Sequence, residues 1–366
     1  MKKIEWITFN AFLDTDMYII KELSKYYLIN WHIIKSGNEN IDYISEISEL
    51  EKIDNLTVTV LECGKRLRKL ECVRSYNTLL DNINKSKPDV IYLTLAGAPY
   101  FIPISILKLN LNKVLLAIHN VHVPKGGTSY YFFKIYNYIA IKFFKNFQTF
   151  SKNQLDVLMS MAPNKNMFYV DFLMKDYGDP TIKRADNKIT FLNFGNIRKY
   201  KRLDVLILAA QEAYEETKIP FKVIIAGKCD DWTEYEKLIK YDFLFDVRLG
   251  RVENNDVPNL FELCDYFVAP YQDIAQSGSA TVSINYEKPV IASKLPAFEE
   301  YLVDGETGYF MSPANITSLK NIIINILHTH ELNYKNLVRN VKSLKENKFS
   351  TQAIVKKYRE AIDDFK

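Results

Sequence analysis

Short apolar runs alternate with longer segments of helical periodicity along the whole chain. In the first half a helical pattern covers 17–25, and the apolar runs are 4–9, 27–34, 90–93 and 114–118. In the second half the apolar runs are 189–194, 221–226, 246–249, 266–269 and 289–292. Short apolar runs separated by helix-length segments are typical of buried parallel strands joined by crossover helices. The pattern therefore predicts two α/β units, each built on a parallel sheet.

A turn-rich stretch separates the two sets of strands. Gly178, Pro180 and two aspartates gather within 174–180, as expected of an interdomain linker. At 366 residues the chain is also long for one hydrophobic core. We therefore expect an N-terminal domain at 1–175, a linker at 176–188, a C-terminal domain at 189–349 and a final helix at 350–366, with packing back toward the N-terminal domain as one arrangement of that helix.

Composition and charge narrow the classes of function. Hydrophobic residues make up 48% of the chain and charged residues 25%, which suits a folded globular protein. A formal net charge of +4 is small for a surface that binds nucleic acid, so we expect no such partner. The four cysteines form no CxxC pair, and the N-terminus enters the first strand directly. These features predict a cytoplasmic protein with reduced thiols.

Candidate chemistry follows the strands, because ligands of open parallel sheets bind beyond the carboxyl ends of the strands. After the run 189–194 come Gly195 and a dense basic loop at 198–202. The glycine permits close backbone approach, and the cations suit a diphosphate. A solvated basic turn explains the same residues about as well.

A second candidate follows the run 266–269. Small residues at 277–280 open a helix there, so its backbone amides would face an anion. The alternative is that Ser277 serves only as an N-cap and Gly278 only as a turn residue. The segments that follow add an ordered series of strand and turn signals.

Taken together, these segments resemble the nucleotide-binding domain of the retaining glycosyltransferases of family four, and the resemblance spans about 189–327. It is carried by the loop after Gly195, the strand ends at 226–227 and 269–270, the segment 249–252, the helix start at 277–278, the run 289–293 and the turn at 304–308. It implies an α/β protein of the GT-B fold, with two Rossmann-like domains whose parallel sheets face each other across an interdomain cleft. It also implies a donor that is a nucleotide-diphosphate sugar, with no metal and no further cofactor.

In that family an Arg and a Lys clamp the diphosphate, and they correspond here to Arg198 and Lys201. Fixed cations of this kind would neutralise the charge that develops on the leaving nucleoside diphosphate. The resemblance places further donor contacts at Gly195, Asn196, Gly227, Arg251, Val252, Tyr271, Gln276, Ser277, Gly278 and Ser279.

One departure from the family concerns the nucleotide's ribose. The two glutamates often found eight residues apart correspond here to Ile274 and Val282. A subset of the family reads Gln-Ser-Gly at this turn, and residues 276–278 resemble that subset. Asp273 and Ser283 are candidates for the missing ribose contact.

The first half resembles the family's acceptor domain at the segment 115–124. His119 ends a strand there, and the resemblance gives it a catalytic position near the transferred sugar; as a lone residue it would more often be a core histidine. We also expect Asn10, Asp14 and His122 on the acceptor side. The triplet 14–16 has the DxD form of metal-dependent transferases, but it precedes a helical pattern and is better interpreted as a cap formed by Asp14 or Thr15.

An aromatic and basic stretch at 129–145 is expected to be a helix with one face in the N-terminal core. The alternative is docking on an anionic membrane face, which would place the protein on the inner surface of the cell membrane.

The resemblance implies a metal-independent, hexosyltransferase-type enzyme that modifies a glycan or polyprenyl-linked acceptor, in bacterial surface-polysaccharide synthesis. The alternatives are a nucleotide-sugar epimerase, for which we find no acid and base carboxylates, and a catalytically silent subunit that binds a nucleotide-sugar or a partner enzyme.

Overall fold

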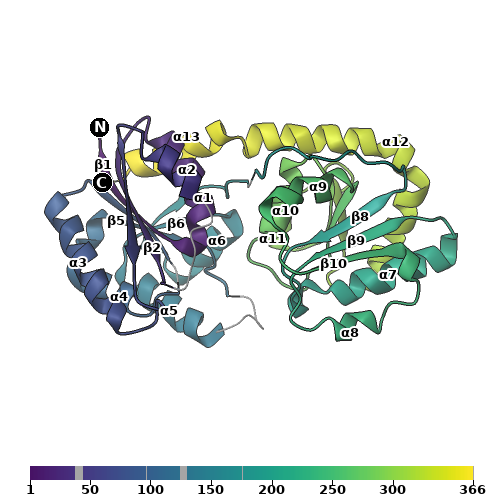
Figure 1. Ribbon diagram of the computed structural model, residues 1–366, viewed down its shortest axis with the longest axis horizontal. Coiled ribbons are helices and arrows are strands. Elements are labelled where there is room, and N and C mark those ends of the chain that lie inside the picture. Colours follow the sequence, from purple (N-terminus) through teal and green to yellow (C-terminus); the bar gives the residue numbers. More distant parts are fainter. Residues whose placement is uncertain (38–43, 96, 124–129, 175, 366) are drawn as a thin grey trace. The chain divides into compact units, whose positions relative to one another are not determined.

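Each half of the chain forms its own parallel sheet in the computed structural model (Figure 1), which describes all residues except 38–43, 96, 124–129, 175 and 366. In its described parts, the first unit comprises residues 1–123, 130–173 and 351–365, and the second comprises 174 and 176–350. The C-terminal helix thus belongs to the first unit. Pro124, Ser129 and Lys175, which fall within the predicted segments, lie outside the described residues.

The sheet of the first unit has seven strands in the order β3-β2-β1-β4-β5-β6-β7. The strands are β1 (Lys3–Phe9), β2 (Leu28–Lys35), β3 (Leu56–Glu62), β4 (Val90–Thr94), β5 (Val114–Ile118), β6 (Asn146–Thr149) and β7 (Asn166–Tyr169). The helices are α1 (Leu13–Leu23), α2 (Ile44–Leu50), α3 (Glu71–Ser86), α4 (Phe101–Lys108), α5 (Tyr130–Phe143), α6 (Lys152–Met161) and α13 (Thr351–Asp363), with short 3-10 turns η1 (Asn10–Phe12) and η2 (Leu111–Lys113).

The sheet of the second unit has six strands in the order β10-β9-β8-β11-β12-β13. The strands are β8 (Thr190–Phe194), β9 (Lys222–Gly227), β10 (Phe245–Leu249), β11 (Tyr266–Ala269), β12 (Val290–Ser293) and β13 (Gly308–Met311). The helices are α7 (Leu203–Thr217), α8 (Thr233–Glu236), α9 (Val257–Glu262), α10 (Gly278–Asn285), α11 (Pro296–Glu299) and α12 (Ile316–Lys348), with 3-10 turns η3 (Lys199–Lys201), η4 (Asp242–Leu244) and η5 (Asn254–Asp256).

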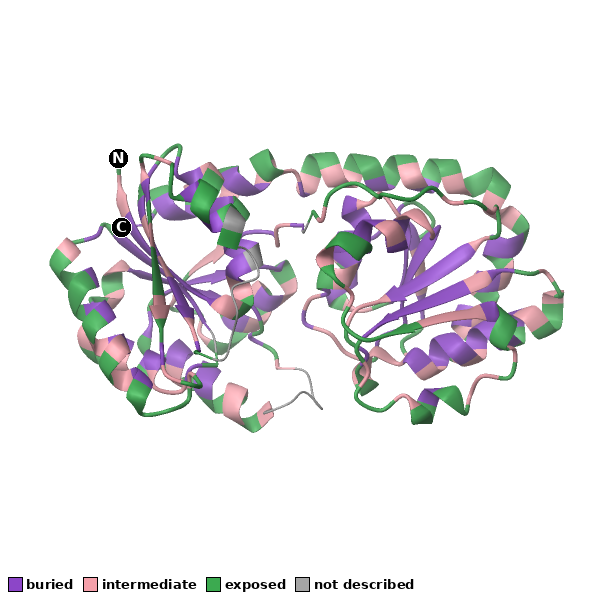
Figure 2. Ribbon diagram, in the orientation of Figure 1, coloured by how far each residue is buried: buried purple, intermediate pink, exposed green. Residues whose placement is uncertain are grey.

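Hydrophobic cores cover both faces of each sheet, since most strand residues are buried while the helices keep exposed outer faces (Figure 2). In the first unit α3, α4 and α5 pack on one face, and α1, α2 and α13 pack on the other. In the second unit α7 and much of α12 pack on one face, and α9, α10 and α11 pack on the other. The apolar runs of the sequence are therefore strands buried on both sides.

The predicted strands are confirmed to within one residue at each end, and all their pairings are parallel. The pattern missed β3, β6, β7 and β13. Three of these have only four residues, and β3 is an edge strand in which only Leu56 is buried. Such strands lack the continuous apolar run that marks a central strand.

The predicted helix cap at Asp14 or Thr15 is wrong. Helix α1 begins at Leu13 with Phe12 as its N-cap, and no side chain bonds the cap. The 3-10 turn η1 leads directly into α1, so the chain is already helical before Asp14. The helix predicted for the aromatic stretch is confirmed as α5, which buries Tyr136, Asn137, Ala140 and Ile141.

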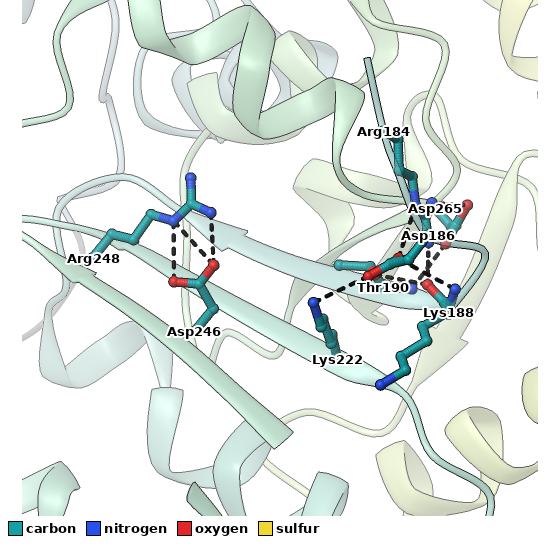
Figure 3. A network of polar contacts seen from close by, with 8 residues as sticks. All are labelled: Arg184, Asp186, Lys188, Thr190, Lys222, Asp246, Arg248 and Asp265. Carbon is teal, nitrogen blue, oxygen red and sulfur yellow. Dashed lines mark hydrogen bonds and ion pairs between the residues drawn. The ribbon is translucent and has the colours of Figure 1, made fainter. Parts of the chain in front are cut away.

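A polar network ties the segment before β8 to the amino ends of three strands (Figure 3). The Asp265 carboxylate accepts hydrogen bonds from the Thr190 amide and from Arg184 Nη1, both at 2.8 Å. Lys222 pairs with Asp186 at 3.1 Å. Asp265 precedes β11, whereas Thr190 and Lys222 begin β8 and β9, so this network lies at the ends of the strands opposite to their carboxyl ends.

Candidate functional site

A pocket of about 440 Å³ opens at the carboxyl ends of β8 and β9, beside the start of α10. Four of its described lining residues are cations and none is a carboxylate: Arg198, Lys201, Lys228 and Arg251. Cationic lining in a concave site focuses positive potential and attracts anions. The pocket therefore suits a small anionic ligand.

Two glycines let the backbone close tightly at the base of the pocket. Gly195 has φ +107°, and a Cβ there would lie 2.8 Å from Ser279 Oγ and 3.4 Å from Lys201 Nζ. Gly227 has φ +151°, and a Cβ there would lie 2.2 Å from the Gly195 carbonyl oxygen. Only glycine fits either position, which brings the two strand ends and α10 together around the pocket.

Lys201 is a half-buried cation at this junction. Its Nζ lies 5.5 Å from the centroid of the Tyr271 ring, and among the described residues its ammonium group makes no ion pair. Burial, with a smaller contribution from Arg198, lowers the pKa of Lys201. An unpaired buried charge is costly, and an anion bound in the pocket would compensate it.

Arg198 lies on the same loop and faces the solvent more. Its Nη1 pairs with the carboxylate of Asp230, which follows β9. The loops after β8 and β9 are also joined by a hydrogen bond of 2.8 Å from the Ile197 amide to the Lys228 carbonyl. Arg198 is thus held at the rim of the pocket with its charge partly neutralised.

The start of α10 supplies backbone donors. Ser277 is the N-cap, and its Oγ accepts the Ala280 amide at 3.3 Å. Gly278 and Ser279 line the pocket, and their amides belong to the first helical turn, where N–H groups have no intrahelical acceptor. The N-cap role of Ser277 and an anion-facing helix start are therefore compatible in this structure.

The pocket contains nine of the residues predicted as donor contacts or catalytic groups: Gly195, Asn196, Arg198, Lys201, Gly227, Arg251, Val252, Gly278 and Ser279. Tyr271 lies beneath Lys201; burial raises the pKa of Tyr271 to about 12, so it stays a neutral phenol. Ser277 caps the helix behind the pocket, and Gln276 is half-buried just before it.

Five lining residues were not predicted as donor contacts from the sequence: Tyr177, Phe194, Tyr200, Lys228 and Val282. Lys228 could have been found, because it is a cation directly after a strand that ends in glycine. Neither Asp273 nor Ser283, the candidates for the ribose contact, lines the pocket. Ser283 is fully buried and donates to the Lys288 carbonyl at 2.9 Å.

In the first unit, His119 lies after β5 in an aromatic stack. The rings of Phe12 and Phe150 lie on it with centroids at 4.2 Å each. Burial lowers the pKa of His119 to about 3, so the imidazole is neutral, and its Nε2 has no hydrogen-bond partner among the described residues. The imidazole is thus a buried, neutral ring whose Nε2 is unsatisfied within the described structure.

The other residues predicted for the acceptor side lie near this stack in the chain. Asn10 begins η1, the turn that carries Phe12 onto His119. The His122 amide donates to Gln154 Oε1 at 2.8 Å, and its side chain is exposed. Asp14 lies in α1, and its side chain is outside the described part of the structure.

Asp16, the last residue of the DxD triplet, is buried in the core of the first unit. Asp16 Oδ2 accepts hydrogen bonds from Thr8 Oγ1 at 2.6 Å and from Trp6 Nε1 at 3.1 Å. Burial raises the pKa of Asp16 to about 6. Within the described residues, no group of three or more His, Cys, Asp or Glu side chains is arranged to hold a metal ion.

Comparison with known proteins finds a family match over the segment that forms the pocket. Residues 179–344 match the family described as Glycosyl transferases group 1, and this segment contains every described lining residue except Tyr177. An uncharacterized glycosyltransferase of Methanocaldococcus jannaschii is 27% identical over 165 residues, which cover 45% of this chain and 45% of that protein. The aligned segment thus spans less than half of this curated relative.

Solved structures match the whole chain. A glycosyltransferase from Rickettsia africae ESF-5 has a TM-score of 0.72 at 16% identity, covering 100% of this chain and 98% of that chain. Anabaena HepE, solved with UDP-glucose, has a TM-score of 0.72 at 14% identity and covers 100% of both chains. Sucrose-phosphate synthase from Thermosynechococcus elongatus has a TM-score of 0.75 at 13% identity, covering 100% of this chain and 99% of that chain. At these identities the likeness shows the fold, which is GT-B with two Rossmann-like units.

Proposed function

We propose that the protein is a metal-independent, retaining glycosyltransferase that takes a hexosyl group from a nucleotide-diphosphate sugar. The observation that carries this proposal is Lys201, a half-buried cation without an ion-pair partner in the described chain, beside Gly195 and the start of α10. A diphosphate in the pocket would meet Lys201, Arg198 and the amides of the first turn of α10. The match of 179–344 to the glycosyltransferase family supports the same chemistry.

In the reaction we propose, the bond between the anomeric carbon and the diphosphate oxygen breaks. The acceptor oxygen bonds to that carbon on the same face, and its proton passes to the departing diphosphate. Fixed cations stabilise the charge that develops on the leaving group, which is where catalysis by electrostatic preorganisation acts. Anabaena HepE is described with UDP-glucose, so UDP-sugars are the first donors to test.

The test is a thermal-shift and hydrolysis screen of nucleotide-sugars with and without EDTA, because a ligand that binds only the folded protein raises its stability. Lys201→Ala and Arg198→Ala should each lower turnover by about 100-fold, the order of magnitude for losing one transition-state contact. Lys199→Ala is the matched control, because Lys199 is on the same loop, does not line the pocket and pairs with Glu234 at 3.2 Å. Near-normal turnover in both pocket variants would contradict the assignment.

A second candidate is a catalytically silent subunit that binds a nucleotide-sugar or a partner enzyme. It is favoured by Ile274 and Val282 at the positions of the family's paired glutamates, with Val282 in the pocket wall. Donor binding without hydrolysis or transfer to any glycan would support it.

We further propose a polyprenyl-linked or glycan acceptor, a role in surface-polysaccharide synthesis and a cytoplasmic location against an anionic membrane. Helix α5 supports the last point, because Tyr131, Ile135 and Tyr138 are 79%, 62% and 62% exposed on the helix that also exposes Lys134 and Lys142. Aromatic and basic side chains on one helix suit an anionic lipid surface. In the described residues, no helix has the length and apolar character needed to cross a bilayer. Flotation with vesicles of phosphatidylglycerol should recover the protein, and recovery equal to that with phosphatidylcholine would contradict the proposal.

A further inference from the structure

A second pocket, of about 460 Å³, lies in the first unit at the carboxyl ends of β2 and β4. Its walls bring together the loop after β3, the turn after β4 and the start of α5, and they include Arg66, Arg68, Gly97, Phe132 and Phe133. Carboxyl ends of parallel strands are where α/β sheets bind ligands. This pocket contains none of the residues discussed above as acceptor contacts.

The loop after β3 gives the pocket a positive rim. The run 65–69 is Lys-Arg-Leu-Arg-Lys, and its four cationic side chains are exposed. Arg66 and Arg68 line the pocket, and neither guanidinium pairs with a carboxylate of the described residues. The nearby carboxylates are engaged elsewhere, since Glu62 pairs with Lys35 at 2.8 Å and Glu71 accepts the Lys65 amide at 2.9 Å.

Helix α3 holds this loop in place. The buried Cys72 donates from Sγ to the Arg66 carbonyl at 3.3 Å, and the buried Tyr76 donates from its hydroxyl to the Leu67 carbonyl at 3.2 Å. The Lys69 amide donates to the Arg66 carbonyl at 3.0 Å. Both arginines therefore extend from a backbone that is fixed before a ligand arrives, which lowers the entropic cost of binding.

The opposite wall of the pocket is aromatic. Phe132 stacks on Tyr136 with ring centroids at 5.3 Å, and Tyr136 donates to the Ala98 carbonyl at 2.7 Å. Phe133 packs over Gly97 so closely that a Cβ at position 97 would lie 3.1 Å from Phe133 Cζ. A rigid apolar wall thus faces two unpaired guanidinium groups across one cavity.

We propose that this pocket binds a phosphate group joined to an apolar chain, with the phosphate on Arg66 and Arg68 and the chain against Phe132 and Phe133. Guanidinium groups bind phosphate through paired hydrogen bonds, and the phenylalanine rings exclude water from the adjoining carbons. If the protein is the transferase proposed above, this phosphate is part of the acceptor. The acceptor role therefore rests on the proposed function. The binding itself does not depend on that function.

The test measures binding of farnesyl phosphate by titration calorimetry, with farnesol and inorganic phosphate as comparison probes and no nucleotide present. Farnesyl phosphate should bind the wild-type protein more tightly than either comparison probe. The double variant R66A/R68A should bind it at least about tenfold more weakly, because hydrogen bonds between charged groups are lost. The double variant K65A/K69A is the matched control: it removes the same charge from the same exposed loop but leaves the pocket lining intact, so its affinity should stay within about twofold.

Equal losses in the two double variants would overturn the proposal, because they would show general charge attraction rather than a site. Equal affinities for farnesyl phosphate and inorganic phosphate would overturn it as well. A Phe133→Leu variant should weaken farnesyl phosphate binding and leave inorganic phosphate unchanged. A UDP thermal shift of R66A/R68A tests donor binding in the second unit separately from phosphate binding in the first. Failure of one proposal can thus be distinguished from failure of the other.

The source of the phosphate is decided by a second arm of the experiment. Flotation with phosphatidylcholine vesicles that carry geranylgeranyl phosphate retains the wild-type protein, and not R66A/R68A, if the ligand is membrane-borne. Binding only to the short soluble phosphate assigns a free organic phosphate. Either result supports the proposed phosphate site. If the protein binds the ligand in neither experiment, the proposal is overturned.

Discussion

The charge of Lys201 lowers the stability of the ligand-free protein, although the same charge is proposed to bind the ligand. Because burial lowers its pKa from the ordinary value of 10.5, the folded protein holds this proton less tightly than the unfolded chain does. The resulting loss of stability is fully present below the lowered pKa and is relieved as the pH rises from that pKa toward 10.5. A partly desolvated cation without an ion pair in the described chain is what a site for an anionic ligand requires, and we propose that such a ligand pairs with Lys201.

Replacing that cation should stabilise the ligand-free protein. We predict that Lys201→Met raises the free energy of unfolding by about 1 kcal/mol at pH 7, because an apolar group of similar length replaces an unpaired charge. For a domain of this size that corresponds to a melting temperature about 2–4 °C higher. Thermal denaturation measures the change, with Lys199→Met as the exposed control. A lower melting temperature for Lys201→Met would show that the charge is compensated within the protein.

His119 and Asp16 give the first unit two opposing responses to acid. The His119 pKa is lowered to about 3 from 6.5, so the unfolded chain binds this proton first and stability falls as the pH drops from 6.5 toward 3. The Asp16 pKa is raised to about 6 from 3.8, so the folded state binds this proton first and stability rises as the pH drops from 6 to 3.8. Between pH 6 and 4 the two effects offset each other.

Single variants separate these effects. We predict that Asp16→Asn loses stability more steeply than the wild type between pH 6 and 4, and that His119→Phe loses it less steeply. Urea unfolding followed by tryptophan fluorescence suits this measurement, since Trp6 and Trp31 are buried in the first unit and Trp232 is only half-buried in the second. Parallel pH profiles for all three proteins would contradict the account.

At the level of strands and loops, the second sheet has a polar network at the amino ends of its strands and the cations of the pocket at the opposite ends. The Asp265 carboxylate joins Arg184 and the Thr190 amide at the amino ends of the strands (Figure 3), whereas Arg198 and Lys201 follow the carboxyl end of β8. Stability and donor binding should therefore respond to different substitutions.

Asp265→Asn tests this separation. We expect a loss of about 2–3 kcal/mol in the stability of the second unit, because a largely buried carboxylate loses its charged hydrogen bonds. The affinity for UDP should stay unchanged. Asp246→Asn is the matched control, since its pair with Arg248 is exposed on β10 and should contribute less than about 1 kcal/mol. A tenfold loss of UDP affinity in Asp265→Asn with an intact fold would contradict the separation.

The central strands and the basic loop could be predicted from the sequence because each has a local signature. A doubly buried strand is a continuous apolar run, and the Gly195 loop follows such a run directly. The outer strands β6 and β7 have only four residues each, so they lack the long apolar run that marks a central strand. Tyr177 could not be predicted as a lining residue, because tertiary packing alone brings the segment before β8 to the pocket.

On the scale of the whole chain, each unit carries its own pocket lined by cations. In the second unit the cations lie beside glycines and a helix start, which suits a diphosphate. In the first unit the arginines face phenylalanines, which suits a phosphate on an apolar chain. The two pockets thus differ in character, and we propose one for the donor and one for the acceptor.

The central claim is that Lys201 binds the diphosphate of the donor without a metal ion. The most direct measurement is a calorimetric cycle in EDTA with UDP and UMP as ligands and with the wild type and Lys201→Met as proteins. We predict that UDP binds the wild type at least about tenfold more tightly than UMP, because the second phosphate gains a charged contact, and that Lys201→Met removes this difference. The same preference for UDP in both proteins, or UDP binding that disappears in EDTA, would contradict the account.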